Sequence, residues 1–351
     1  MFRRRIEKLL EMTPTNTAVF VSSKANIFYY SGFTSEDAYL IITHDKKYIV
    51  TDSRYFIQAK EQAKDFELVD ISIGYKEIFA RIEGYNIAVE ENNITFSELD
   101  KIKAVVSSDT EIIKFASQIC MPRKIKDKNE IKAISEAERI GDEAFLYILD
   151  KIRPGASEEE IALELEFFMR KCGASSLSFE TVVASGARSA MPHGTASKKL
   201  IENGDFVTLD FGCVFEGYCS DMTRTVVVGK GEQWQKEIYE IVLSAQMAAL
   251  DALVVGKKCS DIDKIARDII HTAGYGKNFG HGLGHSVGLQ IHEMPSLSTR
   301  CNEIIENGHI LTVEPGIYLE GKGGVRIEDL VAICDGNVQN LTKSPKELII
   351  V

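Results

Sequence analysis

Residues 209–225 read LDFGCVFEGYCSDMTRT and carry two aspartates on segments that otherwise predict buried strands. The strand expected over Phe206–Phe211 places three apolar side chains on one face and Asp210 on the other, because side chains alternate along a strand. Asp221 leads into the apolar run Val226–Val228. A carboxylate on a mostly apolar strand is costly unless a cation or hydrogen bonds compensate for its desolvation.

Two glutamates further along the chain repeat this pattern. Glu314 follows the apolar strand expected over Ile310–Val313 and precedes a Pro-Gly pair that ends it. Arg326 and Glu328 share one face of a strand expected over Val325–Ile333, and the opposite face is apolar at most positions. Several such carboxylates in one chain suggest a metal site.

Histidines suitable as ligands lie in residues 279–295, FGHGLGHSVGLQIHEMP, which contain His281, His285 and His292. The glycines between them disfavour a helix and let the imidazoles approach a small centre. His193, in the segment AMPHG, is a further candidate.

Carboxylates with a single imidazole suit Mn, Co or Fe, and Zn also accepts such oxygen and nitrogen ligands. Two ions ~3.5–4 Å apart could share carboxylates and hold a bridging hydroxide as the nucleophile. The remaining histidines, among them His193, could stabilise charge on an attacked carbonyl. The pattern therefore predicts metal-assisted hydrolysis.

Each feature alone has a simpler interpretation. A single Asp on a strand is more often capped or exposed, and a lone His is more often a core or surface residue. No Gly-Lys-Ser/Thr follows the glycine-rich segment, and the Gly-x-Ser-x-Gly motif of serine hydrolases is absent. The prediction depends on the joint pattern.

The length of 351 residues predicts two domains. The first ~120 residues alternate short apolar and amphipathic segments and predict an α/β unit with a mixed sheet, in which Tyr39–Thr51 forms a hairpin. The other strands are expected at Ala18–Val21, Leu68–Ile71 and Ile87–Val89, and the helices at Phe2–Met12, Arg54–Lys64, Lys76–Ile82 and Ser97–Val105.

A domain boundary is expected near Pro122, followed by the charged run Arg123–Lys128, which we expect to be solvated. Beyond it, Asp127 can cap a long helix, and Ser157 with Glu160 has capping-box spacing for a second. About 100 residues on, two more helical stripes follow, so the second domain resembles a weak repeat of helix pairs, each followed by strands.

The composition excludes several other classes of protein. The formal net charge is −11, which argues against a nucleic-acid surface as the main partner. No stretch approaches the ~18 apolar residues of a membrane helix, and the basic start meets acidic residues rather than an apolar signal core. Seven scattered cysteines without a Cys-x-x-Cys pair predict reduced thiols and a cytoplasmic protein.

The ordered set Asp210, Asp221, His285, Glu314 and Glu328 resembles the five ligands of the dinuclear M24 metallopeptidases with the pita-bread fold. The match is nearest to Xaa-Pro aminopeptidases and proline dipeptidases, which also carry a creatinase-like, ribonuclease-H-like α/β domain. The resemblance thus implies an α+β chain with a creatinase-like domain over 1–123 and a pita-bread catalytic domain over 124–351. The segments that carry it are NIFYYSGF (26–33), TDSRYFIQA (51–59), MPHG (191–194), LDFGCVFEGYCSDMTRT (209–225), FGHGLGHSVGLQIHEMP (279–295), TVEPGIY (312–318) and GGVRIED (323–329).

The resemblance also implies a role for each ligand. Asp210 would bind one ion, His285 and Glu314 the other, and Asp221 and Glu328 both. Two divalent ions are implied, Mn²⁺ first, with Co²⁺ or Zn²⁺ as alternatives.

The same resemblance implies the catalytic roles. Glu314 would also carry the proton of the attacking water to the leaving proline nitrogen. His193, His281 and His292 would bind substrate and stabilise the tetrahedral intermediate, and Arg326 would hold the carboxylates. Peptides with proline at the second position would be cleaved by a homodimer or homotetramer, without nucleic acid or membrane partners.

Three related classes remain as alternatives. Methionine aminopeptidases share the five ligands but lack the first domain and typically the GGVRIED segment. Creatinase-type amidinohydrolases share both domains without the metal set. A non-catalytic pita-bread binding protein would be expected to have lost ligands, and here none is missing.

Substrate length is the remaining choice. A dipeptidase must hold the free carboxylate of the substrate's proline, and many proline dipeptidases carry Arg directly after the proline of the His-Glu-x-Pro segment. Here Ser296 occupies that position, although Arg188 or Arg300 could substitute. The sequence therefore favours an aminopeptidase acting on longer peptides, with a dipeptidase as the alternative.

Overall fold

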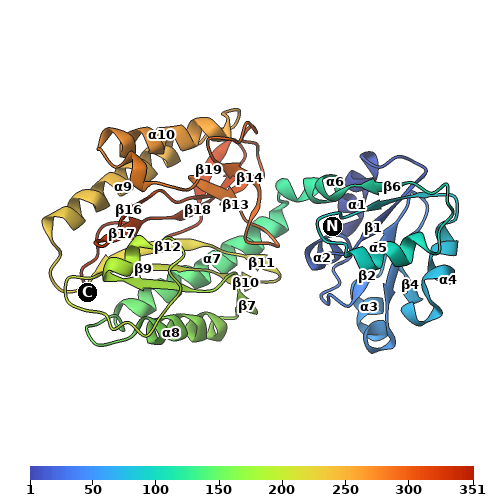
Figure 1. Ribbon diagram of the computed structural model, residues 1–351, viewed down its shortest axis with the longest axis horizontal. Helices are drawn as coiled ribbons and strands as arrows, with labels where there is room; N and C mark the ends of the chain where they lie inside the picture. Colours follow the sequence, from blue (N-terminus) through green and yellow to red (C-terminus); the bar gives the residue numbers. More distant parts are fainter. The chain divides into compact units, whose positions relative to one another are not determined.

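The computed structural model describes all residues, 1–351, and divides into two compact units, Met1–Arg123 and Lys124–Val351 (Figure 1). Helices and sheets occur in both units, as the predicted α+β class requires. None of the helices combines the length and apolar character needed to cross a bilayer. All seven cysteines are free.

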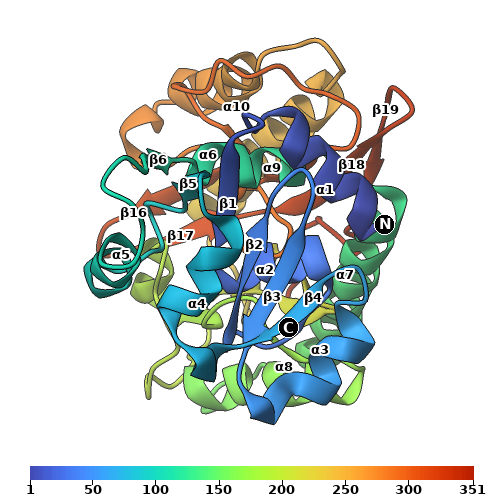
Figure 2. The same ribbon diagram turned by 90° about the vertical axis from the view of Figure 1, so that its right-hand side faces the viewer.

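The first unit is built on a mixed six-stranded sheet of order β4-β3-β2-β1-β5-β6. Figure 2 shows β1, β2 and β3 side by side, with β2 antiparallel to both neighbours, which confirms the predicted hairpin. The strands are β1 (Thr17–Val21), β2 (Ala38–Ile42), β3 (Lys47–Thr51), β4 (Glu67–Asp70), β5 (Asn86–Val89) and β6 (Ile112–Lys114). The helices are α1 (Phe2–Glu11), α2 (Lys24–Ser31), α3 (Phe56–Gln62), α4 (Tyr75–Phe79), α5 (Phe96–Lys103) and α6 (Ala116–Cys120).

Helix α2 is an element that the sequence pattern did not predict. Its residues KANIFYYS are buried on most sides, including Asn26, Tyr29 and Tyr30, so the segment has no polar face and no helical period. It ends at Gly32, whose φ of 77° is in the left-handed region.

Two packed helix pairs dominate the second unit. Figure 1 shows its strands between them, with α7 and α8 on one side and α9 and α10 on the other, each pair belonging to its own apolar core. The predicted caps are present, because Asp127 with Glu130 and Ser157 with Glu160 form capping boxes. The helices are α7 (Lys128–Leu149), α8 (Glu158–Lys171), α9 (Gln233–Ala252) and α10 (Cys259–Thr272).

The strands of the second unit form several small sheets rather than one large one. Their orders are β12-β9-β8, β15-β18-β19, β11-β10-β7, β13-β14 and β16-β17, all antiparallel. The bounds are β7 (Ser176–Leu177), β8 (Val182–Ser185), β9 (Phe206–Phe211), β10 (Cys213–Phe215), β11 (Tyr218–Cys219), β12 (Met222–Val227), β13 (Gly284–Ser286), β14 (Glu293–Leu297), β15 (Ile310–Val313), β16 (Gly316–Leu319), β17 (Gly323–Arg326), β18 (Asp329–Cys334) and β19 (Asn337–Asn340).

Two expectations are wrong. The strand expected over Val325–Ile333 is divided into β17 and β18, because the amide N–H of Glu328 donates to Thr223 O (3.1 Å) and the chain passes from one sheet to another. The charged run after Pro122 is not solvated throughout, since Arg123 and Lys126 are only 3% and 4% exposed. Arg123 donates to Asn26 Oδ1 at 2.8 Å, and Lys126 Nζ donates to Ser286 Oγ at 2.7 Å.

Candidate metal centre

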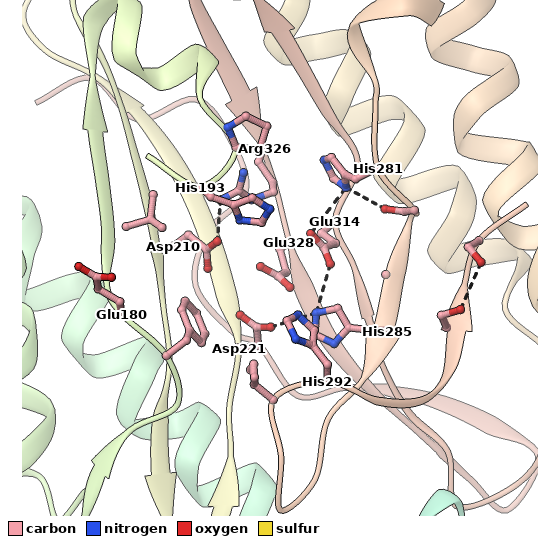
Figure 3. Close-up of a pocket in the computed structure, with 18 of the residues that line it drawn as sticks. Glu180, His193, Asp210, Asp221, His281, His285, His292, Glu314, Arg326 and Glu328 are labelled. Atoms are coloured by element: carbon pink, nitrogen blue, oxygen red, sulfur yellow. Dashed lines mark hydrogen bonds and ion pairs between the residues drawn. The ribbon is translucent and has the colours of Figure 1, made fainter. Parts of the chain in front are cut away.

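All nine residues predicted for the site line one cavity of about 530 Å³ in the second unit (Figure 3). They come from segments more than a hundred positions apart in the chain. The set consists of His193, Asp210, Asp221, His281, His285, His292, Glu314, Arg326 and Glu328.

The two aspartates are placed by the sheet β12-β9-β8. Asp210 is the fifth residue of β9 and pairs with Val182 on one side and Thr223 on the other. Asp221 directly precedes β12. Alternation along the strands thus directs both carboxylates to the face that borders the cavity.

The other three ligand candidates come from the second half of the unit. His285 lies on β13, Glu314 follows β15, and Glu328 lies between β17 and β18. Strand β13 approaches β15 closely at Gly284, where an added Cβ would be 2.0 Å from the Thr312 carbonyl oxygen. Only glycine fits there, which explains its presence beside His285.

The distances place four of the five ligand candidates around one point. His285 Nε2 is 3.5 Å from Asp221 Oδ2 and 3.5 Å from Glu314 Oε1. Ligand atoms of Asp221, His285 and Glu328 all lie within 4.8 Å of one another. Because a carbonyl can only accept, His285 Nδ1 donates to Ser286 O at 3.2 Å, which leaves the Nε2 lone pair directed at the carboxylates.

Two buried carboxylate oxygens in this cluster have no hydrogen-bond partner, Asp210 Oδ1 and Glu328 Oε1. Buried oxygens of this kind are normally hydrogen-bonded. Two of them without a partner in one cavity indicate that a bound group, rather than the protein, supplies the partner. Hard divalent cations bind carboxylate oxygens together with an imidazole nitrogen. The residues present therefore fit divalent metal ions.

The pKa values reflect the same crowding. Burial, followed by the charges of Glu328, Asp210 and Glu314, raises the pKa of Asp221 well above its usual range. Burial and the charges of Glu314 and Asp210 do the same to the pKa of Glu328. Burial raises the pKa of Glu314 to about 8 and lowers that of His285 to about 4, so the imidazole is neutral and available as a ligand.

Arg326 and Tyr318 connect the ligand cluster to His281. Arg326 donates to Asp210 Oδ2 at 2.6 Å and to the Tyr318 hydroxyl at 2.9 Å. That hydroxyl donates to His281 Nε2 at 2.9 Å, because His281 Nδ1 is committed as a donor to Gly282 O at 2.8 Å. Tyr318 ends the TVEPGIY segment, but nothing in its spacing predicted this contact.

Threonine hydroxyls hold two of the glutamates, and no sequence motif indicated this role. Thr223 Oγ1 donates to Glu328 Oε2 at 2.7 Å, and Thr312 Oγ1 donates to Glu314 Oε1 at 3.2 Å. Glu138 is a further buried carboxyl behind the site, and it accepts from the amide of Asp221 at 3.3 Å. Thr312 is the one polar residue of β15, and Thr223 is one of three polar residues in β12, so neither was marked by its spacing as the partner of a glutamate.

Known protein families match most of the chain. Residues 132–335 match metallopeptidase family M24, and residues 5–125 match the Creatinase/Prolidase N-terminal domain. A Bacillus subtilis protein named uncharacterized peptidase YqhT is 44% identical over 337 residues, which cover 95% of each chain.

Many solved structures resemble the chain, and the following two do so over nearly its whole length. The Xaa-Pro dipeptidase from Bacillus anthracis is 41% identical with a TM-score of 0.95, and the alignment covers 100% of both chains. The X-Pro aminopeptidase from Thermotoga maritima is 38% identical with a TM-score of 0.92, covering 99% of this chain and 100% of the other.

The chain belongs to metallopeptidase family M24 and is a hydrolase with a creatinase-type N-terminal domain and a pita-bread domain. Membership of this family implies divalent metal ions and peptide substrates. The predicted fold class and enzyme class are thereby confirmed.

Proposed function

We propose that the chain is a Xaa-Pro aminopeptidase, which hydrolyses the bond between an N-terminal residue and a following proline. The observation that carries this proposal is the convergence of four carboxylates and His285 on one cavity, where two of the buried carboxylate oxygens have no hydrogen-bond partner. The two structural relatives named for cleavage next to proline support the substrate class.

We propose two divalent ions, Mn²⁺ first and Co²⁺ or Zn²⁺ as alternatives. Their ligands would be Asp210, Asp221, His285, Glu314 and Glu328. When bound, such ions lower the pKa of water and polarise the carbonyl that is attacked.

The protein's own groups would then bind the peptide and move the proton. Glu314 accepts the proton of the attacking water at a carboxylate oxygen and delivers it to the leaving proline nitrogen. The imidazoles of His193 and His292 are exposed and border the cavity, so each can donate to the oxygen that becomes negative. His281 is held by Tyr318 as described above, and Arg326 fixes Asp210.

One experiment tests the proposal directly. The purified protein is treated with a chelator, Mn²⁺, Co²⁺ or Zn²⁺ is added back singly, and a Xaa-Pro dipeptide is assayed beside a Xaa-Pro tripeptide. We expect metal-dependent cleavage, with the tripeptide preferred. Cleavage of Met-initiated peptides alone would instead favour a methionine aminopeptidase.

Substrate length can be tested at Ser296, which lines the cavity and lies opposite His285 in the β13-β14 pair. Arg188 is bound to Glu158 and to the Thr195 carbonyl, and neither it nor the exposed Arg300 lines the cavity, which supports a preference for longer peptides. The alternative, a dipeptidase, is favoured by the name of the Bacillus anthracis relative.

Replacing Ser296 with arginine is expected to raise the kcat/KM ratio of dipeptide to tripeptide roughly tenfold or more, because a charge-assisted hydrogen bond to a carboxylate contributes about 1.5–3 kcal/mol. Ser296→Met controls for side-chain bulk. An unchanged ratio would refute this account of length selection, and a wild-type preference for dipeptides would establish the dipeptidase alternative.

Replacing His292 with alanine is expected to lower kcat by about 10²-fold, the loss typical for removing one donor to a developing oxyanion, and to leave the metal content unchanged. Steady-state kinetics and elemental analysis measure the two effects. His271→Ala, an exposed histidine on α10 away from the cavity, serves as the control. Loss of metal in the His292 variant would show that our division between ligands and substrate-binding histidines is wrong.

We also propose the division of the chain into domains 1–123 and 124–351, a homodimer or homotetramer, and a cytoplasmic location. The free cysteines support the location, since thiols stay reduced in that compartment. Light scattering of the purified protein tests the assembly state.

A further inference from the structure

Lys126 precedes α7 and has a side chain that is only 1% exposed. Its Nζ donates to Ser286 Oγ at 2.7 Å and to Glu293 Oε2 at 3.2 Å. The Glu293 side chain is itself 6% exposed. A buried ammonium and a buried carboxylate each require a partner, so this contact constrains where the segment carrying Ser286 and Glu293 can lie.

The two partners of Lys126 face each other at an irregularity in the β13-β14 pair. His285 pairs with Ser296, but the next residue, Ser286, pairs with Glu293, so the register shifts between His285 and Ser286. A bulge of this kind bends the strand and redirects neighbouring side chains. Lys126 thus bonds to both members of the pair on the far side of the bulge.

Each partner also adjoins a histidine of the cavity. Ser286 follows His285 and Glu293 follows His292 in the sequence. The two imidazole rings lie with centroids 4.5 Å apart at 71°, and Figure 3 shows them side by side below Glu314. The separation of the rings therefore depends on how the loop 286–293 closes.

Further contacts fasten this loop to the same carboxylate. Glu293 Oε1 accepts from the amide of Gln290 at 3.2 Å, and an added Cβ on Gly288 would be 2.6 Å from the Glu293 carboxylate. The carbonyl of Gly288 accepts from the amide of Cys219 at 2.8 Å. The Glu293 carboxylate packs directly on the loop backbone, so its position and that of the loop are linked.

We propose that Lys126 is a positioning residue that, through Glu293 and Ser286, holds the imidazole of His292 beside His285. The kinetic consequence rests on the proposed function, in which His292 contacts the substrate. The geometric statement, that Lys126 sets the position of the His292 ring, does not depend on it.

The test compares a charge-balanced variant with a matched control. Lys126→Met alone leaves the Glu293 carboxylate buried without its ammonium, so Lys126→Met combined with Glu293→Gln is used. Lys124→Met is the control, because Lys124 lies in the same segment and pairs with Glu303 at 2.7 Å, where both side chains are partly exposed and neither borders the cavity. Ser286→Ala, which leaves the ion pair intact, replaces the double variant if that protein does not fold.

The expected kinetic result is a change in kcat rather than in KM. We expect the double variant to lose roughly tenfold or more in kcat with a KM change below about twofold. The reason is that misplacing a group that acts mainly in the transition state lowers kcat more than it changes KM. In a His292→Ala background, the same pair of substitutions should lower kcat by less than about twofold, because the group they position is gone. An equal loss in both backgrounds, or an equal loss in Lys124→Met, would overturn the proposal.

A structural measurement tests the positioning role of Lys126 independently of the proposed function. In a crystal structure of the double variant, we expect the His285 and His292 rings to lie further apart than the 4.5 Å of the parent chain. An unchanged separation would overturn the positioning role. Failure of the wild type to cleave any Xaa-Pro peptide would overturn the proposed function, and the ring separation would still decide the role of Lys126.

Discussion

Alanine at Asp221 or Glu328 is expected to abolish hydrolysis, with losses of roughly 10³-fold or more in kcat/KM. Loss of a residue that merely supports a ligand costs ~10–100-fold, and a ligand should cost more. Both side chains are buried in the carboxylate cluster, and each has a ligand atom within 4.8 Å of His285. Removing either should leave at least one of the two proposed ions weakly bound.

Kinetics at saturating Mn²⁺ and elemental analysis of the same samples measure this loss. Asp268→Ala is a suitable control, because that aspartate is exposed on α10, where it pairs with Lys264. A variant that keeps most of its activity with one ion per chain would contradict the two-ion centre.

The second large effect concerns the stability of the protein when its metal has been removed. Burial raises the pKa of Glu314 to about 8, and the pKa values of Asp221 and Glu328 are raised well above their usual range by burial and mutual repulsion. The folded chain therefore keeps protons that the unfolded chain releases at lower pH. For Glu314 this contribution to stability is complete below the unfolded pKa near 4.5 and is lost as the pH rises through about 8. The contributions of Asp221 and Glu328 have the same sign.

Buried histidines determine which pH range is informative. Burial lowers the pKa of His281, His285 and His309 to about 4, so acid below their ordinary value of 6.5 destabilises the fold through them. Between pH 7 and 9 these histidines are neutral in both states. In that range each carboxyl that keeps its proton only in the folded chain lowers the free energy of unfolding by up to about 1.4 kcal/mol per pH unit.

We therefore expect the Tm of the chelated protein to fall from pH 7 to pH 9, and an excess of Mn²⁺ to remove most of the fall. Glu138, whose pKa burial raises to about 8, adds a decline of the same sign. Because Glu138 is not one of the proposed ligands, we expect its decline in both curves, so the difference between the curves isolates the centre. Thermal unfolding by circular dichroism measures both curves. Parallel curves with and without Mn²⁺ would show that these carboxylates do not bind the ion.

Local patterns in the sequence were sufficient for much of the fold. Alternation placed Asp210 opposite the apolar face of its strand, and the spacing of Asp127 with Glu130 and of Ser157 with Glu160 located two helix starts. These features depend on residues within a few positions of one another, so their geometry follows from the strand and helix periods. The family resemblance added the ligand set, which periodicity alone could not assemble.

The features that the sequence did not predict have one cause, which is that they depend on tertiary contacts rather than on local pattern. Helix α2 has no amphipathic pattern because it is buried on most sides, and the strand expected over Val325–Ile333 divides because Glu328 bonds to the backbone of Thr223, 105 positions away. Tyr318 contacts Arg326 because β16 pairs with β17, and it contacts His281, which lies 37 positions earlier in the chain.

Which residues alternate, cap helices and match a family could be learned from the order of amino acids, since these properties are local or shared by relatives. Which charges are buried, and against what, depended on contacts between distant segments. Lys126 illustrates the difference, because it sits in a run of charges typical of a solvated linker, yet its partner Glu293 is 167 positions away. Because desolvation makes an unpaired buried charge costly, such a charge needs a partner, and no local pattern encodes the distance between the two.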